Sequence, residues 1–290
     1  MAAQTETAVV PNATTSAAFT TRYYHNPAQD CSDAEIRRLW ASACTLGESS
    51  VTRAASAAEI FETVPAFSIM QDRNGKVSPD REVFRNRFIL EGIQNGRTVA
   101  MITGYHLEHP TYGTIIATGL IMVSPSVQGS GFLYAYIEWF YQWFAHTGNK
   151  DVIVVSATMR PRAIAVAMGH TRENHYTACK HQPEPWHIDC AKFYLEAYNK
   201  GRTHAPAGLA VFEEQDFSYR NYWPEVARTS RDRLAAQHHD PNINAMFENL
   251  DCLNKGDMAV MVGKISLKKI EAMKWGLFKT KSRSNSNPKL

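Results

Sequence analysis

Apolar and polar residues follow one another through the middle of the chain in a way that predicts β-strands. Two β-rich runs, residues 99–107 and 114–123, flank the turn-forming segment Glu-His-Pro-Thr-Tyr-Gly at 108–113, so we expect an antiparallel hairpin there. A continuous apolar run over 152–158 predicts a further, buried strand. The alternation over 257–265 predicts another. The hairpin is therefore expected near the centre of a β-sheet.

Helix-start and helix-stop signals precede the hairpin. Residues 32–35 read Ser-Asp-Ala-Glu, a capping box that predicts a helix over 33–45. Ser78-Pro79 has the form of a helix start. Asn95-Gly96 has the form of a helix end. We therefore expect a second helix over 78–94.

Helical periodicity returns after the hairpin. One helix face is shared by the apolar residues Leu133, Tyr136, Ile137, Phe140 and Phe144, which predicts a helix ending near Gly148. Pro161 predicts the start of another helix, through Met168. This strand–helix–strand–helix succession predicts a mixed sheet in a layered α/β fold. Beyond Gly169 the weaker patterns predict a strand at 208–213 and helices at 224–237 and 242–249.

Composition and charge restrict the class of protein. The 290 residues are 44% hydrophobic and 20% charged, which is typical of a globular protein. The net charge of +3 is unevenly distributed. Residues 264–290 hold eight Lys and Arg against one Glu, so that segment carries +7 and the rest of the chain −4. A faintly acidic body offers no broad phosphate-binding face, so we expect no nucleic-acid partner.

The cysteines and the two ends of the chain indicate the cellular compartment in which the protein is expected. Five dispersed cysteines favour a reducing compartment. No apolar run approaches the roughly 20 residues of a membrane span, and no Lys or Arg precedes Arg22. We therefore expect a cytoplasmic protein with no membrane span. Residues 1–21 read as a disordered leader and 277–290 as a disordered basic tail.

The segment from Val123 to Leu133 carries the clearest chemical signal. A strand ends there in a proline-marked turn, and Gln128-Gly129-Ser130-Gly131 then opens into a helix. Glycines let the backbone approach a ligand, and the first N–H groups of a helix attract a phosphate. The nucleoside-triphosphate loop motif is absent. A dinucleotide fingerprint would need a small residue where Tyr134 stands.

This segment resembles the acyl-CoA motif of the GNAT superfamily of N-acyltransferases, Val-x-Pro-x-x-[Gln/Arg]-x-x-Gly-x-[Gly/Ala]. The matching residues are Val123, Pro125, Gln128 and Gly131, while Leu133 departs from it. Residues 160–165, Arg-Pro-Arg-Ala-Ile-Ala, are similar to a second family element, in which the first residue is usually Asn. The resemblance covers about residues 80–170.

The resemblance implies an α/β (α+β) fold with a mixed, mostly antiparallel, twisted sheet flanked by helices. We expect the GNAT-like core to occupy residues 22–200. Residues 201–276 would form a C-terminal extension that either completes the same sheet or caps it.

The resemblance also implies an activity, the transfer of an acyl group from acyl-CoA to the amine of a small molecule or amino acid. The strand N–H groups of Met122 and Val123 would face the thioester carbonyl. The pyrophosphate would lie on the N–H groups of Gln128, Gly129, Ser130, Gly131 and Phe132. Candidates for the base that takes the amine proton are Glu108 and His106.

Two departures from the family keep alternatives open. Ala167 stands where a tyrosine often protonates the departing thiolate, and Tyr176 or His175 are candidates to replace it. Leu133 is compatible with a donor carried on acyl-carrier protein, as in synthases of N-acyl amino acids or lactone signals. The same departures are compatible with a non-catalytic module that binds acyl-CoA or a partner protein.

A run of histidines and cysteines follows the second family element. It consists of His170, His175, Cys179, His181, His187 and Cys190. These residue types bind zinc, but their spacings are irregular, so structural or surface positions are favoured and no metal is expected.

Overall fold

The structure is a computed structural model. It describes residues 19–50, 69–71, 77–79, 84–127, 132, 147–148, 151–170, 175–176, 182–200, 208–223, 238–268 and 270–271. Several predicted segments lie outside these residues: most of the leader, the loop at 128–131, the helices expected over 133–146 and 224–237, and the basic tail.

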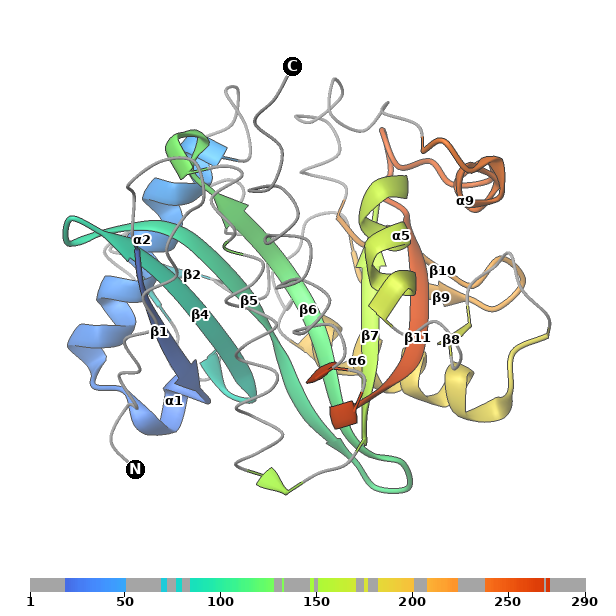
Figure 1. Ribbon diagram of the computed structural model, residues 1–290, viewed down its shortest axis with the longest axis horizontal. Helices are drawn as coiled ribbons and strands as arrows, with labels where there is room; N and C mark the ends of the chain where they lie inside the picture. Colours follow the sequence, from blue (N-terminus) through green and yellow to red (C-terminus); the bar gives the residue numbers. More distant parts are fainter. Residues whose placement is uncertain are drawn as a thin grey trace, which may run out of the picture.

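A single large sheet runs through the molecule (Figure 1). Its strand order is β1-β4-β5-β6-β7-β11-β10-β9, and β8 also pairs with β11. The strands are β1 (Thr20–His25), β4 (Arg87–Gln94), β5 (Arg97–His109), β6 (Gly113–Val123), β7 (Asp151–Thr158), β8 (His175–Tyr176), β9 (Val211–Glu213), β10 (Ser218–Arg220) and β11 (Met258–Ser266). A separate ribbon pairs β2 (Ile69–Gln71) with β3 (Val77–Pro79).

Most strand pairs are antiparallel. Within the described residues β6 and β7 form the one parallel pair of the large sheet. The predicted fold class, a mixed and mostly antiparallel sheet flanked by helices, is therefore confirmed. The hairpin expected at the centre of the sheet is also confirmed, as β5 and β6.

The helix expected over residues 78–94 is wrong. Residues 77–79 form β3, and Arg87–Gln94 form β4, an inner strand of the sheet. The first six residues of β4 are all buried, so it has no polar face whose period would distinguish a strand from a helix. Asn95 and Gly96 have φ of 51° and 74° and form the two-residue turn into β5.

The helices include two that were expected, over 33–45 and from Pro161. They are α1 (Pro27–Asp30), α2 (Asp33–Ser50), α5 (Pro161–His170), α6 (Pro185–Lys200) and α9 (Pro241–Ala245), with a 3₁₀ turn η3 at Pro125–Val127. The Ser32 Oγ accepts a hydrogen bond from the N–H of Glu35 at 3.2 Å, as a capping box requires. The helix α6 was not expected, and α9 covers only part of 242–249. No helix among the described residues is long and apolar enough to cross a membrane.

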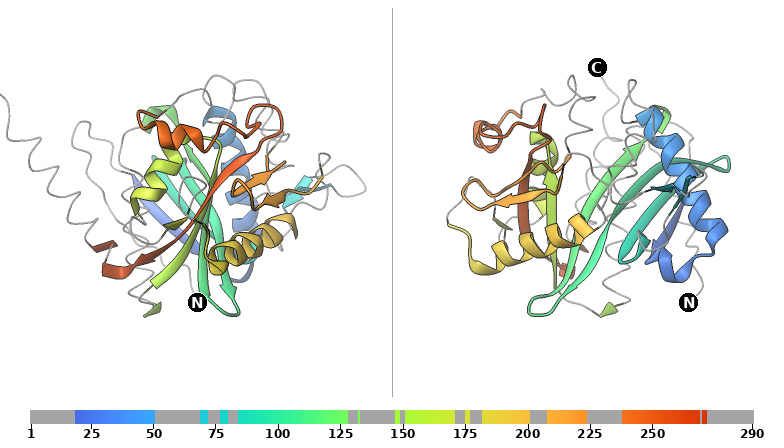
Figure 2. Two further views of the ribbon diagram at one scale, coloured as in Figure 1. Left: turned by 90° about the vertical axis from the view of Figure 1, so that its right-hand side faces the viewer. Right: turned by 180° about the vertical axis from the view of Figure 1, so that it is seen from behind.

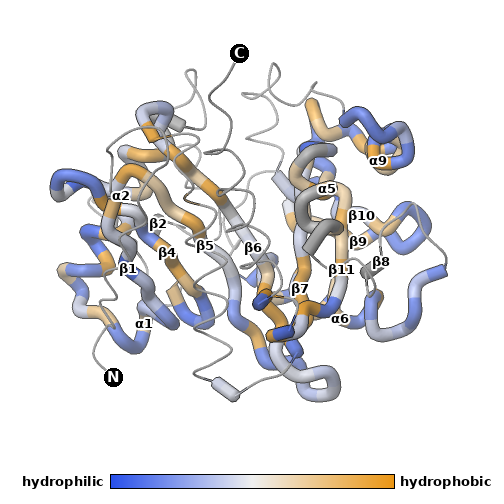
Figure 3. The backbone as a smooth tube through the Cα atoms, viewed as in Figure 1, coloured by the Kyte–Doolittle hydropathy of each residue, from blue (hydrophilic) through white to orange (hydrophobic). Residues whose placement is uncertain are grey.

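The helices cover both faces of the sheet, and Figure 2 shows α2 and α6 together on one of them. On that face Leu39 of α2 and Tyr194 of α6 join one apolar core. On the other face Ile164 of α5 and Ile243 of α9 join a second core. Figure 3 shows apolar residues along the central strands and polar residues at the outer turns. The sheet is thus the middle layer of three.

The two ends of the described chain extend the sheet further than expected. The strand β1 begins at Thr20, inside the stretch predicted as a disordered leader, and Phe19 and Thr21 are buried. That prediction is therefore wrong for residues 20 and 21, because six β-forming residues pair with β4. At the other end β11 pairs with β7 from Ala259 to Ser266, so the C-terminal extension contributes a strand to the same sheet.

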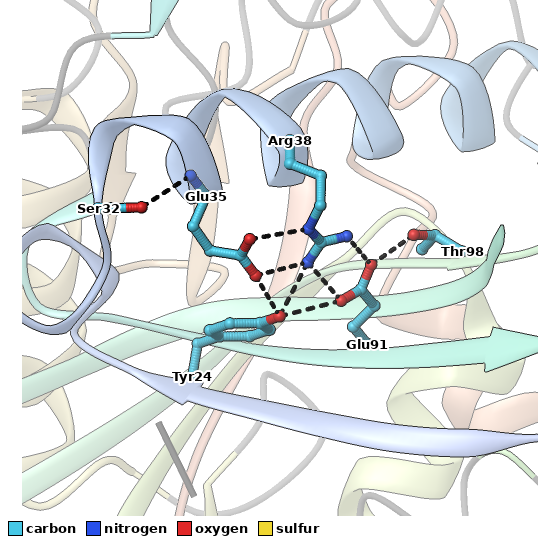
Figure 4. A network of polar contacts seen from close by, with 6 residues as sticks. All are labelled: Tyr24, Ser32, Glu35, Arg38, Glu91 and Thr98. Carbon is cyan, nitrogen blue, oxygen red and sulfur yellow. Dashed lines mark hydrogen bonds and ion pairs between the residues drawn. The ribbon is translucent and has the colours of Figure 1, made fainter. Parts of the chain in front are cut away.

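A polar network fastens α2 to the sheet (Figure 4). The carboxylate of Glu91, which is 0% exposed, accepts two hydrogen bonds of 2.8 Å from the Arg38 guanidinium. It also accepts hydrogen bonds from Tyr24 and from Thr98. Burial and the nearby Glu91 raise the pKa of Tyr24, so its phenol stays protonated and donates. Every buried polar group of the network is therefore partnered, as a structural role requires.

Candidate functional site

The strands β6 and β7 separate part of the way along their length. They pair only between Ile115–Thr118 and Ile153–Ser156. β6 continues to Val123, whereas β7 ends at Thr158. Figure 1 shows the two strands diverging beyond their paired part. Among the described residues, no strand pairs with residues 119–123 on the side where β7 lay.

A β-bulge begins where the strands part. On the side of β5, Gly104 is opposite Thr118 and Ile102 is opposite Ile121. Residues 119 and 120 of β6 therefore face the single residue Thr103, one residue more than a regular ladder allows. Such an extra residue bends the strand that carries it, which fits the divergence of β6 from β7.

The separated part of β6 is accessible although it belongs to a central strand. Gly119 is exposed, and the side chain of Ile121 is 47% exposed. Met122 is buried in the core on the α2 side, and Val123 packs against the core on the other side. Since N–H groups alternate in direction along a strand, some of those in 119–123 point away from β5. The opening between β6 and β7 thus presents one backbone edge of β6, next to the exposed apolar side chain of Ile121.

Both ends of the predicted phosphate loop are held in place. At its start, the N–H of Ser124 donates to Val99 at 2.8 Å, and the buried Val127 donates to Ser124 at 3.0 Å. At its end, the ring of Phe132 is 4% exposed and packs edge-on against Phe19, with ring centroids 5.6 Å apart. Residues 128–131 between them lie outside the described part of the chain.

Gly92 of β4 makes room for Phe132. A Cβ on Gly92 would lie 2.8 Å from the Phe132 ring, closer than carbon atoms approach one another. Phe132 can therefore sit against the sheet only because residue 92 has no side chain. This contact sets where the segment after the loop begins.

The two residues expected as bases lie together on β5. His106 Nε2 is 3.4 Å from Glu108 Oε1, and Glu108 accepts hydrogen bonds from the Thr114 hydroxyl at 2.9 and 3.1 Å. The ring of His106 also contacts His25, with centroids 4.6 Å apart, and the Tyr23 hydroxyl is 3.0 Å from His25 Nδ1. Sequence reasoning missed His25 because β1 lay in and beside the supposed leader.

These two residues differ in their distance from the opening. His106 is opposite Ile116, two residues before the strands part, which is about 7 Å along β6. Glu108 is opposite Thr114, four residues before the strands part, which is about 13 Å along β6. Burial, and then the charge of His25, lower the pKa of His106 to about 4, so its imidazole is neutral near pH 7.

The residues expected as the acid lie on the short strand β8. Tyr176 and His175 pair with Val262 and Gly263 of β11. Because β11 and β7 lie between β8 and β6, Tyr176 is about 14 Å from β6 across the sheet. The structure does not bring these residues next to the opening.

Two members of the histidine and cysteine run have structural surroundings. His187 Nδ1 accepts a hydrogen bond of 3.1 Å from the N–H of Glu184, just before α6. Cys190 is buried, and burial followed by the nearby Asp189 raises the pKa of its thiol to about 12. Within the part of the chain that is described, no three His, Cys, Asp or Glu residues are placed to hold a metal ion.

Comparisons with known proteins bear on the fold. No protein family matches the chain by sequence, and no curated protein does. Among solved structures, an aminoglycoside acetyltransferase from an uncultured soil metagenomic sample matches 52% of this chain and 86% of its own, at 13% identity and a TM-score of 0.33. An acyl-CoA N-acyltransferase from Pseudomonas aeruginosa matches 55% of this chain and 87% of its own, at 13% identity and a TM-score of 0.32.

A third solved structure, from Desulfovibrio desulfuricans and described as an acetyltransferase of the GNAT family, matches more of the chain. It covers 86% of this chain and 99% of its own, at 7% identity and a TM-score of 0.32. The mixed, mostly antiparallel sheet flanked by helices agrees with the fold class that the GNAT resemblance implies. At these identities and scores we take nothing further from the three proteins.

Proposed function

We propose that this protein is an N-acyltransferase that binds an acyl thioester in the opening between β6 and β7 and passes its acyl group to an amine. One observation carries the proposal: the parallel strands pair over four residues and then part, leaving Gly119 and Ile121 of a central strand exposed. A sheet normally keeps the backbone of its central strands paired, because unpaired buried N–H groups cost free energy.

The donor would lie along the accessible part of β6. Its pyrophosphate would bind the backbone N–H groups at the start of the segment that begins with Phe132, where the motif Gln128–Gly131 stands. Ile121 would contact the apolar arm of the donor. The sequence resemblance supplies Met122 and Val123 as the strand residues whose N–H groups would face the carbonyl oxygen.

The reaction is a direct transfer. The amine nitrogen forms a bond to the carbonyl carbon, the carbonyl electrons pass to the oxygen, and the carbon–sulfur bond then breaks. The amine proton ends on the thiol product. Only acyl thioester and amine are consumed, and amide and free thiol are released.

His106 is the better of the two candidate bases. It lies about 7 Å along the strand from the point of separation, and its lowered pKa keeps it neutral and able to accept a proton. The Glu108 carboxylate, 3.4 Å away, would stabilise the imidazolium that forms. Tyr176 and His175 lie about 14 Å from β6 across the sheet, too far to protonate the thiolate directly at the opening.

A non-catalytic acyl-CoA-binding module is the second candidate function. Ala167 of α5 favours it, because no hydroxyl is present where the resemblance expects an acid. A third candidate function is transfer from a donor carried on acyl-carrier protein, which the departure of Leu133 from the motif favours. The predicted cytoplasmic location suits any of these donors.

The test is binding and turnover with acyl-CoAs of graded chain length. We expect a rise in melting temperature with acyl-CoA, and release of free thiol when primary amines are added. Stabilisation without thiol release from any amine would favour the binding module. No stabilisation by any acyl-CoA would contradict transfer from CoA thioesters.

A pair of charge variants locates the donor. Gly131→Asp should abolish the acyl-CoA-induced shift, because a carboxylate would meet the pyrophosphate. Thr111→Asp is the control: it adds the same charge at an exposed position of the β5–β6 turn. If both variants kept the shift, the donor would not lie at the loop.

A further inference from the structure

Charged residues on the three strands around the opening lie only at or next to the strand ends. Across β5, β6, β7 and the two residues that follow β7, the Asp, Glu, Lys and Arg residues are Arg97, Glu108, Asp151 and Arg160. Each of these residues is exposed. β6 itself, which lies between the other two strands, carries no charged side chain. The charge around the opening therefore depends on which end of the strands each of the four residues occupies.

The two arginines lie at the open end of β6, which is the end where β7 has parted from it. Arg97 is the first residue of β5, and the Ser124 N–H holds the end of β6 to the Val99 carbonyl of β5 at 2.8 Å. β7 runs parallel to β6, so it ends at the same side of the sheet. The N–H of Arg160 donates to the hydroxyl of Thr158, the last residue of β7, at 3.1 Å. A ligand at the open end of β6 therefore has one arginine on each side.

The two carboxylates lie at the opposite, hairpin end of β6. Glu108 of β5 is opposite Thr114, the second residue of β6, and Asp151 is the first residue of β7. The side chains around β6 thus make its open end positive and its hairpin end negative. An anionic ligand is attracted to the first end and repelled by the second. A phosphorylated donor along β6 is therefore expected to place its phosphates at the open end and its acyl group toward the paired part of the strands.

We propose that Arg97 and Arg160 bind the phosphate groups of the donor from the two sides of β6. This role rests on the proposed acyltransferase function and narrows its donor to thioesters of phosphorylated pantetheine, whether in CoA or on a carrier protein. A guanidinium group donates parallel hydrogen bonds to phosphate oxygens, which suits it to this task. The backbones of β5 and β7 are about 10 Å apart where both pair with β6, so side chains from both strands can reach one ligand between them.

The experiment measures, by calorimetry on the full chain, the affinity for three thioesters with the same acyl group: acyl-CoA, acyl-phosphopantetheine and acyl-pantetheine, which has no phosphate. For acyl-CoA we expect Kd to rise about fivefold in Arg97→Gln and in Arg160→Gln, as for loss of an exposed ion pair. In the double variant it should rise about 25-fold. Kd for acyl-pantetheine should not change. Added salt should weaken acyl-CoA binding less in the double variant than in the unchanged chain.

Acyl-phosphopantetheine distinguishes the two sources of the phosphate. A loss shared by acyl-CoA and acyl-phosphopantetheine would place the arginines at the phosphate that CoA and a carrier protein both supply. A loss with acyl-CoA alone would place them at the nucleotide phosphates, and CoA would then be the donor that the site fits. Either result supports binding of phosphate by the two arginines.

Lys264→Gln is the matched control, because it removes the same charge from an exposed residue of the sheet. Lys264 is opposite Ile153 of β7, five residues before Thr158, which is about 17 Å along the strand from the open end. Its affinity for acyl-CoA should equal that of the unchanged chain. Arg160→Lys keeps the charge and should keep most of the affinity. Since all these residues are exposed, the melting temperature without ligand should stay the same in every variant.

Unchanged affinity of the double variant for acyl-CoA would overturn the phosphate site and leave the proposed function standing. Equal losses with acyl-CoA and acyl-pantetheine would also overturn it, and so would a loss in Lys264→Gln as large as in Arg160→Gln. A loss confined to one of the two arginines would overturn the two-sided site. Failure of every thioester to bind the unchanged chain would contradict the proposed function itself.

Discussion

Two regions of β5 treat buried polar groups in opposite ways. At the start of β5, Thr98 joins Arg38 and Tyr24 in hydrogen-bonding to the fully buried carboxylate of Glu91 on the adjacent strand β4. Around Thr103, in the middle of the strand, a fully buried hydroxyl has no partner among the described residues, and the facing strand exposes its backbone. A saturated polar group, with all its hydrogen bonds made, stabilises the fold, whereas a buried hydroxyl without a partner costs free energy.

The largest expected effect is a loss of stability when the hydrogen-bonded network around Glu91 is broken. Arg38→Ala would leave the Glu91 carboxylate buried without its cation, so we expect the free energy of unfolding to fall by about 3 kcal/mol. Denaturant titration measures this change. Arg37→Ala, on the exposed side of α2, is the matched control and should alter stability by less than about 0.5 kcal/mol. A small loss for Arg38→Ala would mean that the network is not structural.

Filling the opening should act on donor binding more than on stability. In Gly119→Val the new Cβ lies 3.0 Å from the Thr103 carbonyl oxygen, which a small shift can relieve, and its methyl groups occupy the space given to the donor. We expect acyl-CoA affinity to fall at least about tenfold, or about 1.4 kcal/mol, by calorimetry. Thr114→Val, at the hairpin end of β6, is the control; if it lost affinity equally, the donor would not lie at Gly119.

The hydrogen-bonded network around Glu91 should also make the free energy of unfolding depend on pH. Hydrogen bonding to Arg38 lowers the pKa of Glu35 below its ordinary value of 4.5. A carboxyl whose folded pKa is depressed stabilises the protein above its unfolded pKa, and this contribution is lost as the pH falls through the folded pKa. We expect the free energy of unfolding to fall as the pH drops below about 4.5. The fall should be shallower in Glu35→Gln, and identical profiles would show that Glu35 contributes nothing.

The smallest effect is expected at the exposed side chain of the opening. Ile121→Ala removes apolar atoms that the donor would bury, so acyl-CoA affinity should fall about threefold. Because Ile121 is 47% exposed, stability should change by less than about 0.5 kcal/mol. Unchanged affinity, with unchanged stability, would place the acyl chain elsewhere.

The elements that the sequence predicted well are those with a complete local signal. The β5–β6 hairpin has a turn segment between two β-rich runs, and α2 has a capping box. The strand β4 was mistaken for a helix because it is buried on both faces, and β1 was missed because it is short. These errors arise where burial, rather than local pattern, decides the structure.

The candidate site likewise has parts that the sequence predicts and parts that it does not. The motif at Val123–Gly131 marks the end of β6 and the loop after it from sequence alone. The bulge that sets Thr103 against Gly119 depends on how β5 and β6 pair, and the opening depends on where β7 leaves β6. No local pattern encodes those pairings, so Gly119 could not have been chosen in advance.

Hydrogen exchange at the backbone of β6 tests most directly whether the donor lies in the opening between β6 and β7. In the free protein we expect fast exchange within residues 119–123 and slow exchange at the paired Ile115–Thr118. Acyl-CoA should slow exchange within 119–123, and more strongly than CoA without an acyl group. Acyl-CoA binding that left exchange at 119–123 unchanged would contradict this placement of the donor.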